Sequence, residues 1–334
     1  MKKTITISIL ALALLSGCTK NRFLSSERLA PISLTPSFTA PSTKALISDA
    51  NIQSETIRVH VSKNDGTTGY SVGGSKYTLA HGGLNWALSD ILYLSVENAK
   101  VFAYAPTPAD PTLVETGEYN TLKRILDIPA TQDMTDQVDF LWCYQDKTND
   151  IDGININSTN PNVALTMKHA LAQVSFVIYG ENYNGSGTIN TVKIRDNSTT
   201  SSLIKMLDAA NDLSLNIADG SISGGEPTLE LSATNIGGTI ETTQPTADLA
   251  ELKSKVNGYI LLVPASITDK TNVQFSFNID AKDYNVALSG VGGINWVAGQ
   301  QYIYTVKLSG TQMSVISVTV TPWTSTHEGE VVIN

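Results

Sequence analysis

The sequence predicts an all-β protein made of antiparallel β-sandwiches, and three observations lead to this fold class. Short segments in which apolar and polar residues alternate recur along the chain. Turn signals such as Asn184-Gly185 and Asp219-Gly220 lie between such segments. Long amphipathic helical patterns, which a parallel α/β fold would place between its strands, do not alternate with them. The clearest alternating segments are 57–62, 174–178, 273–279, 302–308 and 316–320.

Length and charge narrow the class of protein further. A chain of 334 residues is long enough for about two domains, each with its own core. An apolar content of 41% excludes a wholly disordered or collagen-like chain. The formal net charge of −9 argues against a nucleic-acid partner, because phosphate binding requires a basic surface.

The first residues have the pattern of an export signal. Lys2 and Lys3 precede an apolar run, 5–15, that is too short to span a bilayer as a helix. The run ends in Leu15-Ser16-Gly17-Cys18, which resembles the lipoprotein box of bacteria and implies removal of residues 1–17 and lipidation of Cys18. The alternative is a plain secretory signal that happens to contain a cysteine. Both interpretations predict an exported protein.

The segment that follows the signal is rich in Ser, Thr and Pro. Residues 30–38 alternate weakly and contain two prolines, which is typical of an edge strand. Residues 41–44 read as an exposed linker, and a half-buried strand begins at Ile57. Short helices are predicted at 120–127 and 246–256, but neither is long enough to set the architecture.

A second cysteine lies within an apolar run that predicts a buried strand, 138–144. With Cys18 lipidated, Cys143 has no partner for an intrachain disulfide. A buried thiol behaves as a small apolar residue, so we interpret Cys143 as part of the core. A nucleophilic role is the weaker interpretation because no histidine is near it in the sequence.

Several segments, taken in order, resemble the Bacteroidales fimbrillin family, the type V pilins. They are the lipoprotein box, Thr43-Lys44-Ala45, the strand 56–62, residues 163–176, 296–306 and 318–323. The resemblance implies two tandem transthyretin-like β-sandwich domains with a few short helices. It divides the chain into a signal peptide (1–17), a lipidated pro-segment with a removable strand (18–44), an N-terminal domain (45–168) and a C-terminal domain (169–334).

The resemblance also implies a function. The chain would be a structural subunit of an adhesive fimbria, exported to the outer membrane as a lipid-anchored precursor. A protease specific for Arg or Lys would remove the N-terminal strand, and its removal would open an apolar groove. A strand of another copy or of a related pilin would then fill that groove. The alternative is a tip or accessory adhesin of the same family that does not polymerise and binds a host glycan or protein.

The maturation site is expected at Lys44, before Ala45, because this residue lies in a linker between two strand candidates. Arg28 is the alternative, but cleavage there would leave the strand at 30–38 attached. Arg58 lies within a predicted strand and should be shielded. In the opposing interpretation Lys44 is merely solvated and the protein stays anchored at Cys18.

The donated strand is expected near the C-terminus, where two apolar segments occur at 313–320 and 329–334. An exposed sheet edge is a template for such a strand, because main-chain hydrogen bonds supply affinity and alternate side chains set the register. The residues expected to enter the neighbour's groove are Val315, Ile316, Val318, Val320, Val331 and Ile333.

No constellation of acid, base or nucleophile indicates an enzyme, a metal site or a cofactor. The acidic stretch 146–152 lacks the alternating acids and the final acid of a calcium-binding loop. The four histidines are far apart in sequence, and His169 is interpreted as a packed residue at the domain junction. The four tryptophans are interpreted as core residues, although two exposed together would form a sugar-stacking platform.

Overall fold

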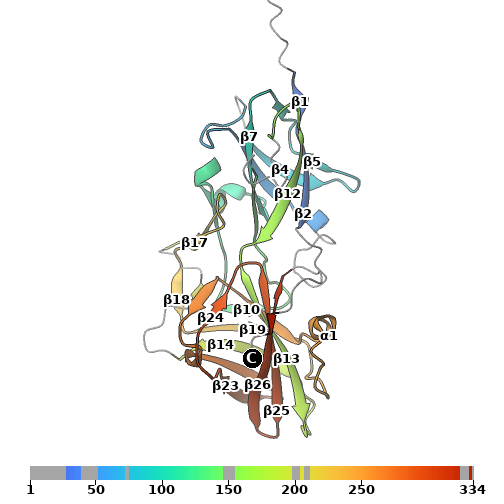
Figure 1. The fold of residues 1–334 in the computed structure, drawn as a ribbon, viewed down its shortest axis with the longest axis vertical. Helices are drawn as coiled ribbons and strands as arrows, with labels where there is room; N and C mark the ends of the chain where they lie inside the picture. The colour runs from blue at the N-terminus through green and yellow to red at the C-terminus, as the bar shows by residue number, and fades with distance from the viewer. Residues whose placement is uncertain are drawn as a thin grey trace, which may run out of the picture.

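The structure, a computed structural model, describes residues 28–38, 52–71, 75–145, 155–197, 204–206, 211–323 and 331–332. Strands build almost all of it, as Figure 1 shows, so the predicted all-β sandwich class is confirmed. The helix predicted at 246–256 is present as α1 (Leu249–Ser254). Among the described residues, none of the helices has the length and apolar character needed to cross a membrane. Short 3-10 turns are η1 (Ile52–Ser54), η2 (Pro111–Leu113), η3 (Tyr119–Thr121) and η4 (Lys270–Asn272).

The N-terminal half forms a seven-stranded sheet that curls around its own core. Its strands, in spatial order, are β2 (Ser33–Phe38), β12 (Asn162–His169), β11 (Leu141–Gln145), β7 (Ala99–Ala105), β3 (Ile57–Lys63), β4 (Lys76–His81) and β5 (Trp86–Leu88). The edge strands β2 and β5 approach each other across the core. A ribbon of β1 (Ala30–Pro31) and β6 (Tyr93–Leu94) covers one end of it.

A four-stranded sheet packs on the outer face of the central strand β7. Its strands are β17 (Ile222–Ser223), β16 (Ser214–Asn216), β9 (Lys123–Ile125) and β8 (Glu115–Thr116). The helix predicted at 120–127 is therefore wrong. Leu122, Arg124 and Leu126 are buried at every second position, a strand period, and pairing with β16 stabilises that strand.

A charged network joins these two sheets. Glu115 of β8 accepts two hydrogen bonds from the Arg58 guanidinium of β3, at 2.9 and 3.1 Å. The Tyr104 hydroxyl donates to the same carboxylate at 3.1 Å, and His60 Nε2 lies 3.3 Å from it. Burial raises the pKa of the Glu115 carboxyl, but the hydrogen bonds from His60 and Arg58 outweigh burial and bring the pKa to about 2.

The C-terminal half is a sandwich of two five-stranded sheets. One sheet has the order β10 (Thr131–Asp133), β19 (Glu230–Thr234), β14 (Ile189–Asp196), β22 (Val273–Ile279) and β23 (Lys282–Ala287). The other has the order β20 (Gly258–Leu262), β13 (Ala172–Glu181), β25 (Gln300–Ser309), β26 (Gln312–Pro322) and β27 (Val331–Val332). Two small ribbons flank them: β15 (Ile204–Met206) with β18 (Glu226–Thr228), and β21 (Ala265–Ile267) with β24 (Ile294–Trp296). Between the sheets, Phe176 packs edge-to-face on Phe275 and Phe277.

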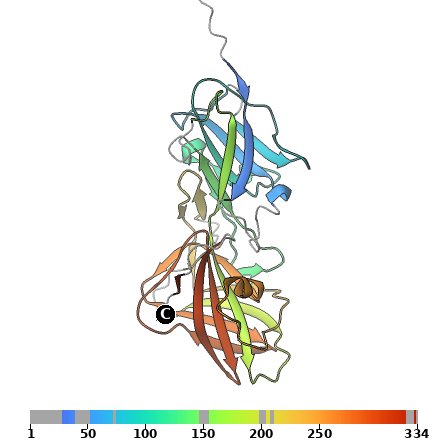
Figure 2. The ribbon, with the colours of Figure 1, turned by 45° about the vertical axis from the view of Figure 1, so that its right-hand side comes forward.

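Strands from both sides of residue 168 share two of the sheets. β9 pairs with β16 in the four-stranded sheet, and β10 pairs in parallel with β19. The chain passes from the seven-stranded sheet to the C-terminal sandwich between His169 and Ala172. Figures 1 and 2 show the two halves stacked along the long axis of the molecule, with β1 at the far pole of the N-terminal half. The domain boundary at 168 stays a prediction. Strands from one side of it pair with strands from the other side, and this pairing connects the two halves.

Candidate assembly site

The N-terminal strand β2 fills a groove at the edge of the seven-stranded sheet. It runs parallel to β12 with six partner positions, from Ser33 opposite Asn162 to Phe38 opposite Met167. Its side chains alternate between exposed and buried, as predicted for the edge strand at 30–38. Pro36 is tolerated there because an edge strand leaves one row of backbone groups unpaired.

Every second residue of β2 enters the core of the curled sheet. Leu34 and Phe38 are 3% and 7% exposed, and Pro36 is buried between them. The three lie beside Val163, Leu165 and Met167 of β12, which are buried in the same core. Full burial of Leu34 and Phe38 contributes about 3–6 kcal/mol before entropy is counted. The groove is therefore apolar, and residues 33–38 supply the strand that fills it.

An aromatic stack lies where this groove meets the C-terminal sandwich. The His169 ring is between Phe38, at a centroid distance of 5.3 Å, and Trp323, at 4.3 Å, and both pairs are nearly parallel. Asp139 holds the imidazole through Nδ1 at 2.9 Å, and both side chains are buried. The prediction that His169 is a packed junction residue is confirmed. Its three partners could not be predicted from the sequence, because they are between 30 and 154 positions away.

The predicted processing residues lie mostly outside the described part of the chain. Cys18, Lys44 and Ala45 belong to residues that the structure does not describe. Arg28, the alternative cleavage residue, is exposed two residues before β1, so cleavage there would keep β1 and β2 attached. Arg58 is shielded within β3 by its bidentate pair with Glu115, as predicted.

The predicted donor residues fall into two groups. Val315, Ile316, Val318 and Val320 lie on β26, which pairs with β25 along its whole length within its own sandwich. Val331 lies on β27, whose two described residues pair with β26 at Thr319 and Val320, while Ile333 lies outside the described residues. Donation of β26 would cost the domain a central part of its sheet. Donation of β27 would cost the two partner positions that the structure describes.

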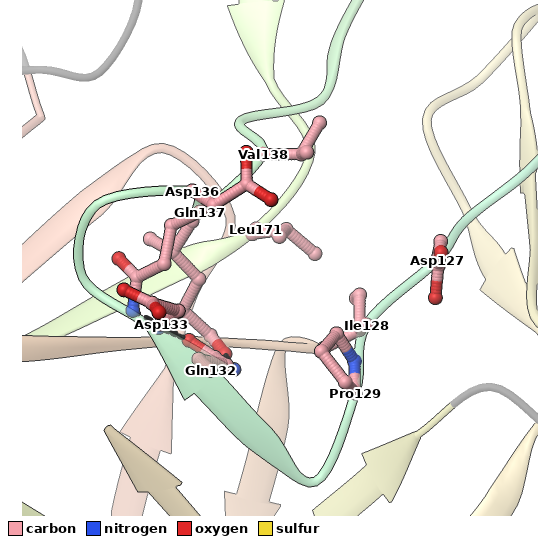
Figure 3. Close-up of a pocket in the computed structure, with 10 residues that line it drawn as sticks. Asp127, Ile128, Pro129, Gln132, Asp133, Asp136, Gln137, Val138 and Leu171 are labelled. Carbon is pink, nitrogen blue, oxygen red and sulfur yellow. Dashed lines mark hydrogen bonds between the residues drawn. The ribbon is translucent and has the colours of Figure 1, made fainter. Parts of the chain in front are cut away.

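A pocket of about 190 Å³ lies beside residues 127–138, the loop that contains β10. Figure 3 shows its lining, which includes the carboxylates of Asp127, Asp133 and Asp136 and the amide of Gln132. The Asp133 carboxylate accepts hydrogen bonds from Thr135 and Asn235, and these bonds lower its pKa. The residues lining this pocket include no histidine, cysteine, serine or lysine. Of the three carboxylates, that of Asp133 is therefore engaged in hydrogen bonds within the loop and with Asn235.

The remaining candidates from the sequence belong to the core. Burial raises the pKa of the Cys143 thiol to about 12, so the thiol is protonated and unreactive, and the core interpretation is confirmed. Trp296 and Trp323 are buried. Trp142 is half-buried, between the ammonium group of Lys168 and the backbone of Gly220. Trp86 packs against the N-terminal core, so the core interpretation of the tryptophans is confirmed. The acidic stretch 146–152 lies outside the described residues.

Comparison with solved structures identifies the same fold in other proteins. A candidate cell adhesion protein from Bacteroides uniformis is 17% identical, with a TM-score of 0.52 over 89% of this chain and 100% of that chain. A second, from Bacteroides ovatus, is 14% identical, with a TM-score of 0.57 over 89% and 99%. A fimbrial protein from Bacteroides vulgatus is 12% identical, with a TM-score of 0.56 over 88% and 99%.

No curated protein matches the sequence. The model of the fimbrillin-like family matches residues 43–323, which is most of the chain. The match begins after β2 and ends at Trp323, so it spans both halves described above. The chain belongs to the fimbrillin-like family.

Proposed function

We propose that the chain is a structural, non-enzymatic subunit of an outer-membrane-associated fimbria that mediates adhesion. In this proposal it is exported as a lipoprotein acylated at Cys18, cleaved after Lys44 and polymerised by exchange of a β-strand. Membership of the fimbrillin-like family supports the fimbrial role. The partners would be other copies of the chain or related pilins and a maturation protease.

One observation supports strand exchange above the others. The strand that fills the groove, β2, precedes Lys44 in the sequence and is an edge strand of its sheet. Cleavage after Lys44 would take β2 with the lipid anchor and leave β12 with an unpaired edge beside an apolar groove. A strand from a second subunit would restore both the backbone hydrogen bonds and the buried side chains.

The C-terminal segment that includes β27 is the better donor of the two predicted segments. Within the described part of the C-terminal segment, β27 pairs with its own domain at two positions, whereas β26 pairs with β25 along its whole length. The contact is head-to-tail, so repeated exchange produces an open filament and not a closed ring.

The experiment that tests strand exchange is a disulfide that locks β2 in place. Thr35 and Ala164 are exposed and directly opposite on β2 and β12, so T35C/A164C brings two cysteines to adjacent strands. We expect the oxidised variant to be cleaved at Lys44 but to remain monomeric, and reduction to restore SDS-resistant ladders. The buried Cys143 thiol does not compete.

A matched disulfide supplies the control. Q274C/A287C joins opposite positions on β22 and β23, far from the groove in the sheet order, and should not change assembly in either redox state. Ladders that form equally well with β2 locked would contradict strand exchange. A native chain that keeps an acylated Cys18 and never forms ladders would instead indicate the accessory adhesin, whose ligand would be a host glycan or protein.

A further inference from the structure

The ribbon of β1 and β6 has apolar side chains on both faces, and one of these faces packs against the core. Pro31 pairs opposite Tyr93, and alternation places Leu29 and Ile91 on the same side of the ribbon. The opposite side buries Ile32, Leu92 and Leu94 in the N-terminal core. We call the first set the outer ribbon face: Leu29, Pro31, Ile91 and Tyr93.

The outer ribbon face is exposed although it is apolar. Leu29 is 56% exposed, Ile91 71% and Tyr93 51%, and Val96 nearby is 63% exposed. Single exposed apolar residues are common, but four on one two-stranded ribbon form a patch of the kind that marks a contact surface. The ribbon lies at the pole of the molecule that is furthest from the C-terminal sandwich (Figures 1 and 2).

We propose that the outer ribbon face is a membrane-contact surface, which rests on lipid while the precursor is anchored. The inference builds on the lipidation of Cys18 in the proposed function. Leu29 is eleven positions after Cys18, so the connecting chain spans at most about 40 Å. The patch therefore belongs to the part of the molecule that the anchor holds closest to the bilayer.

The chemistry of the connecting segment supports a lipid partner. Residues 19–28 contain Lys20, Arg22 and Arg28 against one acid, Glu27, in a protein that is acidic as a whole. Basic residues next to an apolar surface favour an anionic lipid surface. Tyrosine is also enriched where a protein meets the boundary between headgroups and acyl chains.

The outer ribbon face would be divided by maturation. Leu29 and Pro31 precede Lys44 and would leave with the lipid anchor, whereas Ile91 and Tyr93 would stay. The membrane contact is thus a property of the precursor. The cleavage that removes the lipid anchor also removes two of the four residues of the outer ribbon face.

The test is binding of the unlipidated precursor chain to vesicles. A chain from residue 18 with Cys18→Ser is mixed with vesicles of phosphatidylglycerol and phosphatidylethanolamine, and the bound fraction is measured by flotation. We expect binding, and we expect the I91S/Y93S variant to reduce the partition coefficient about tenfold, because both apolar side chains are lost from the face. Circular dichroism confirms that the variant is folded.

The control replaces two apolar residues that are more exposed and lie elsewhere on the surface. L84S/V291S changes side chains that are fully or almost fully exposed, outside the ribbon, and should bind vesicles like the parent chain. Equal vesicle binding by the parent chain and I91S/Y93S would overturn the proposal, as would no binding by either. A dimer in sedimentation equilibrium that I91S/Y93S abolishes would assign the face to a second copy instead. The assay needs neither acylation nor cleavage, so its failure leaves the locked-strand experiment unaffected.

Discussion

At the scale of single residues, the pair formed by Glu115 and His60 determines how the N-terminal half responds to acid. The pKa of Glu115 is about 2, below its usual value of 4.5, so its stabilising effect is complete above pH 4.5 and is lost as the pH falls towards 2. Burial, partly offset by Glu115, lowers the pKa of His60 below 6.5, so the folded state holds this ring neutral. Protonation of His60 in the unfolded chain therefore reduces stability as the pH falls below 6.5.

We predict that the free energy of unfolding decreases from pH 7 to pH 5, and that His60→Gln flattens this slope. Glu115→Gln should cost about 3–5 kcal/mol at pH 7, because it leaves the Arg58 guanidinium without its charged partner. Urea unfolding followed by circular dichroism measures both effects. The exposed Glu226→Gln serves as control and should change stability by less than about 0.5 kcal/mol. A slope that is the same with and without His60 would contradict this assignment.

Phe38 is a second residue whose contribution to the free energy of unfolding can be predicted. Phe38→Ala removes a buried ring from the N-terminal core and one partner from the His169 stack. We expect a loss of about 3 kcal/mol in the free energy of unfolding of the uncleaved precursor. In the chain that starts at Ala45 this residue is absent, so the substitution can act only before maturation. Leu29→Ala, on the exposed side of the neighbouring strand, should have almost no effect on stability.

At the scale of elements, the short strand β10 attaches the loop of residues 127–138 to the C-terminal sandwich. The Gln132 amide donates to the Leu261 carbonyl at 2.6 Å and accepts from the Leu261 N–H at 3.0 Å, so one side chain replaces a strand partner. Gln132 is buried, and its loss leaves the N–H and the carbonyl of Leu261 without this partner.

We predict that Gln132→Ala costs about 2–4 kcal/mol, since two buried hydrogen bonds are lost, and that proteolysis near residues 127–138 becomes faster. Gln312→Ala, at an exposed position of β26, is the matched control and should be neutral. Limited proteolysis with mass spectrometry reads out the local effect. Unchanged cleavage in Gln132→Ala would show that the loop is held by other contacts.

The strands show which parts of the fold could be predicted from the sequence. Alternation predicted β3, β13, β22, β25 and β26, because their apolar side chains repeat with the period of a strand. It failed at 120–127, where Arg124 is buried between Tyr104 and Phe140 and a charged residue therefore occupies a core position. Burial of a cation between aromatic rings is decided by tertiary contacts, which a local pattern does not contain.

The candidate site was predictable only in part, for the same reason. The prolines and the weak alternation at 30–38 indicated an edge strand, and β2 is one. The sequence could not show that β2 pairs with β12, more than 120 residues later, or that Phe38 reaches His169. The outer ribbon face was missed because two segments about 60 residues apart each contribute only two of its four residues.

At the scale of the whole molecule, the chain that starts at Ala45 should behave differently from the precursor. Without β2 the N-terminal core is open along β12, so we expect this chain to associate at micromolar concentration while the precursor stays monomeric. A synthetic peptide of residues 30–38 in excess should occupy the groove and block association. The same peptide with Leu34→Ser and Phe38→Ser is the control and should not block, because its buried side chains are lost. Light scattering measures the outcome, and equal effects of both peptides would contradict a groove specific for β2.

The parallel pairing of β2 with β12 has a consequence for the geometry of a fibre. A replacement strand that reproduces the six partner positions on β12 must run in the same direction as β2, from the pole of the N-terminal half towards the junction with the C-terminal sandwich. Its parent subunit then stands at that pole, and every subunit points the same way. The fibre has a polarity, with an open groove at one end and an undonated strand at the other, so its two tips are chemically different and need different caps.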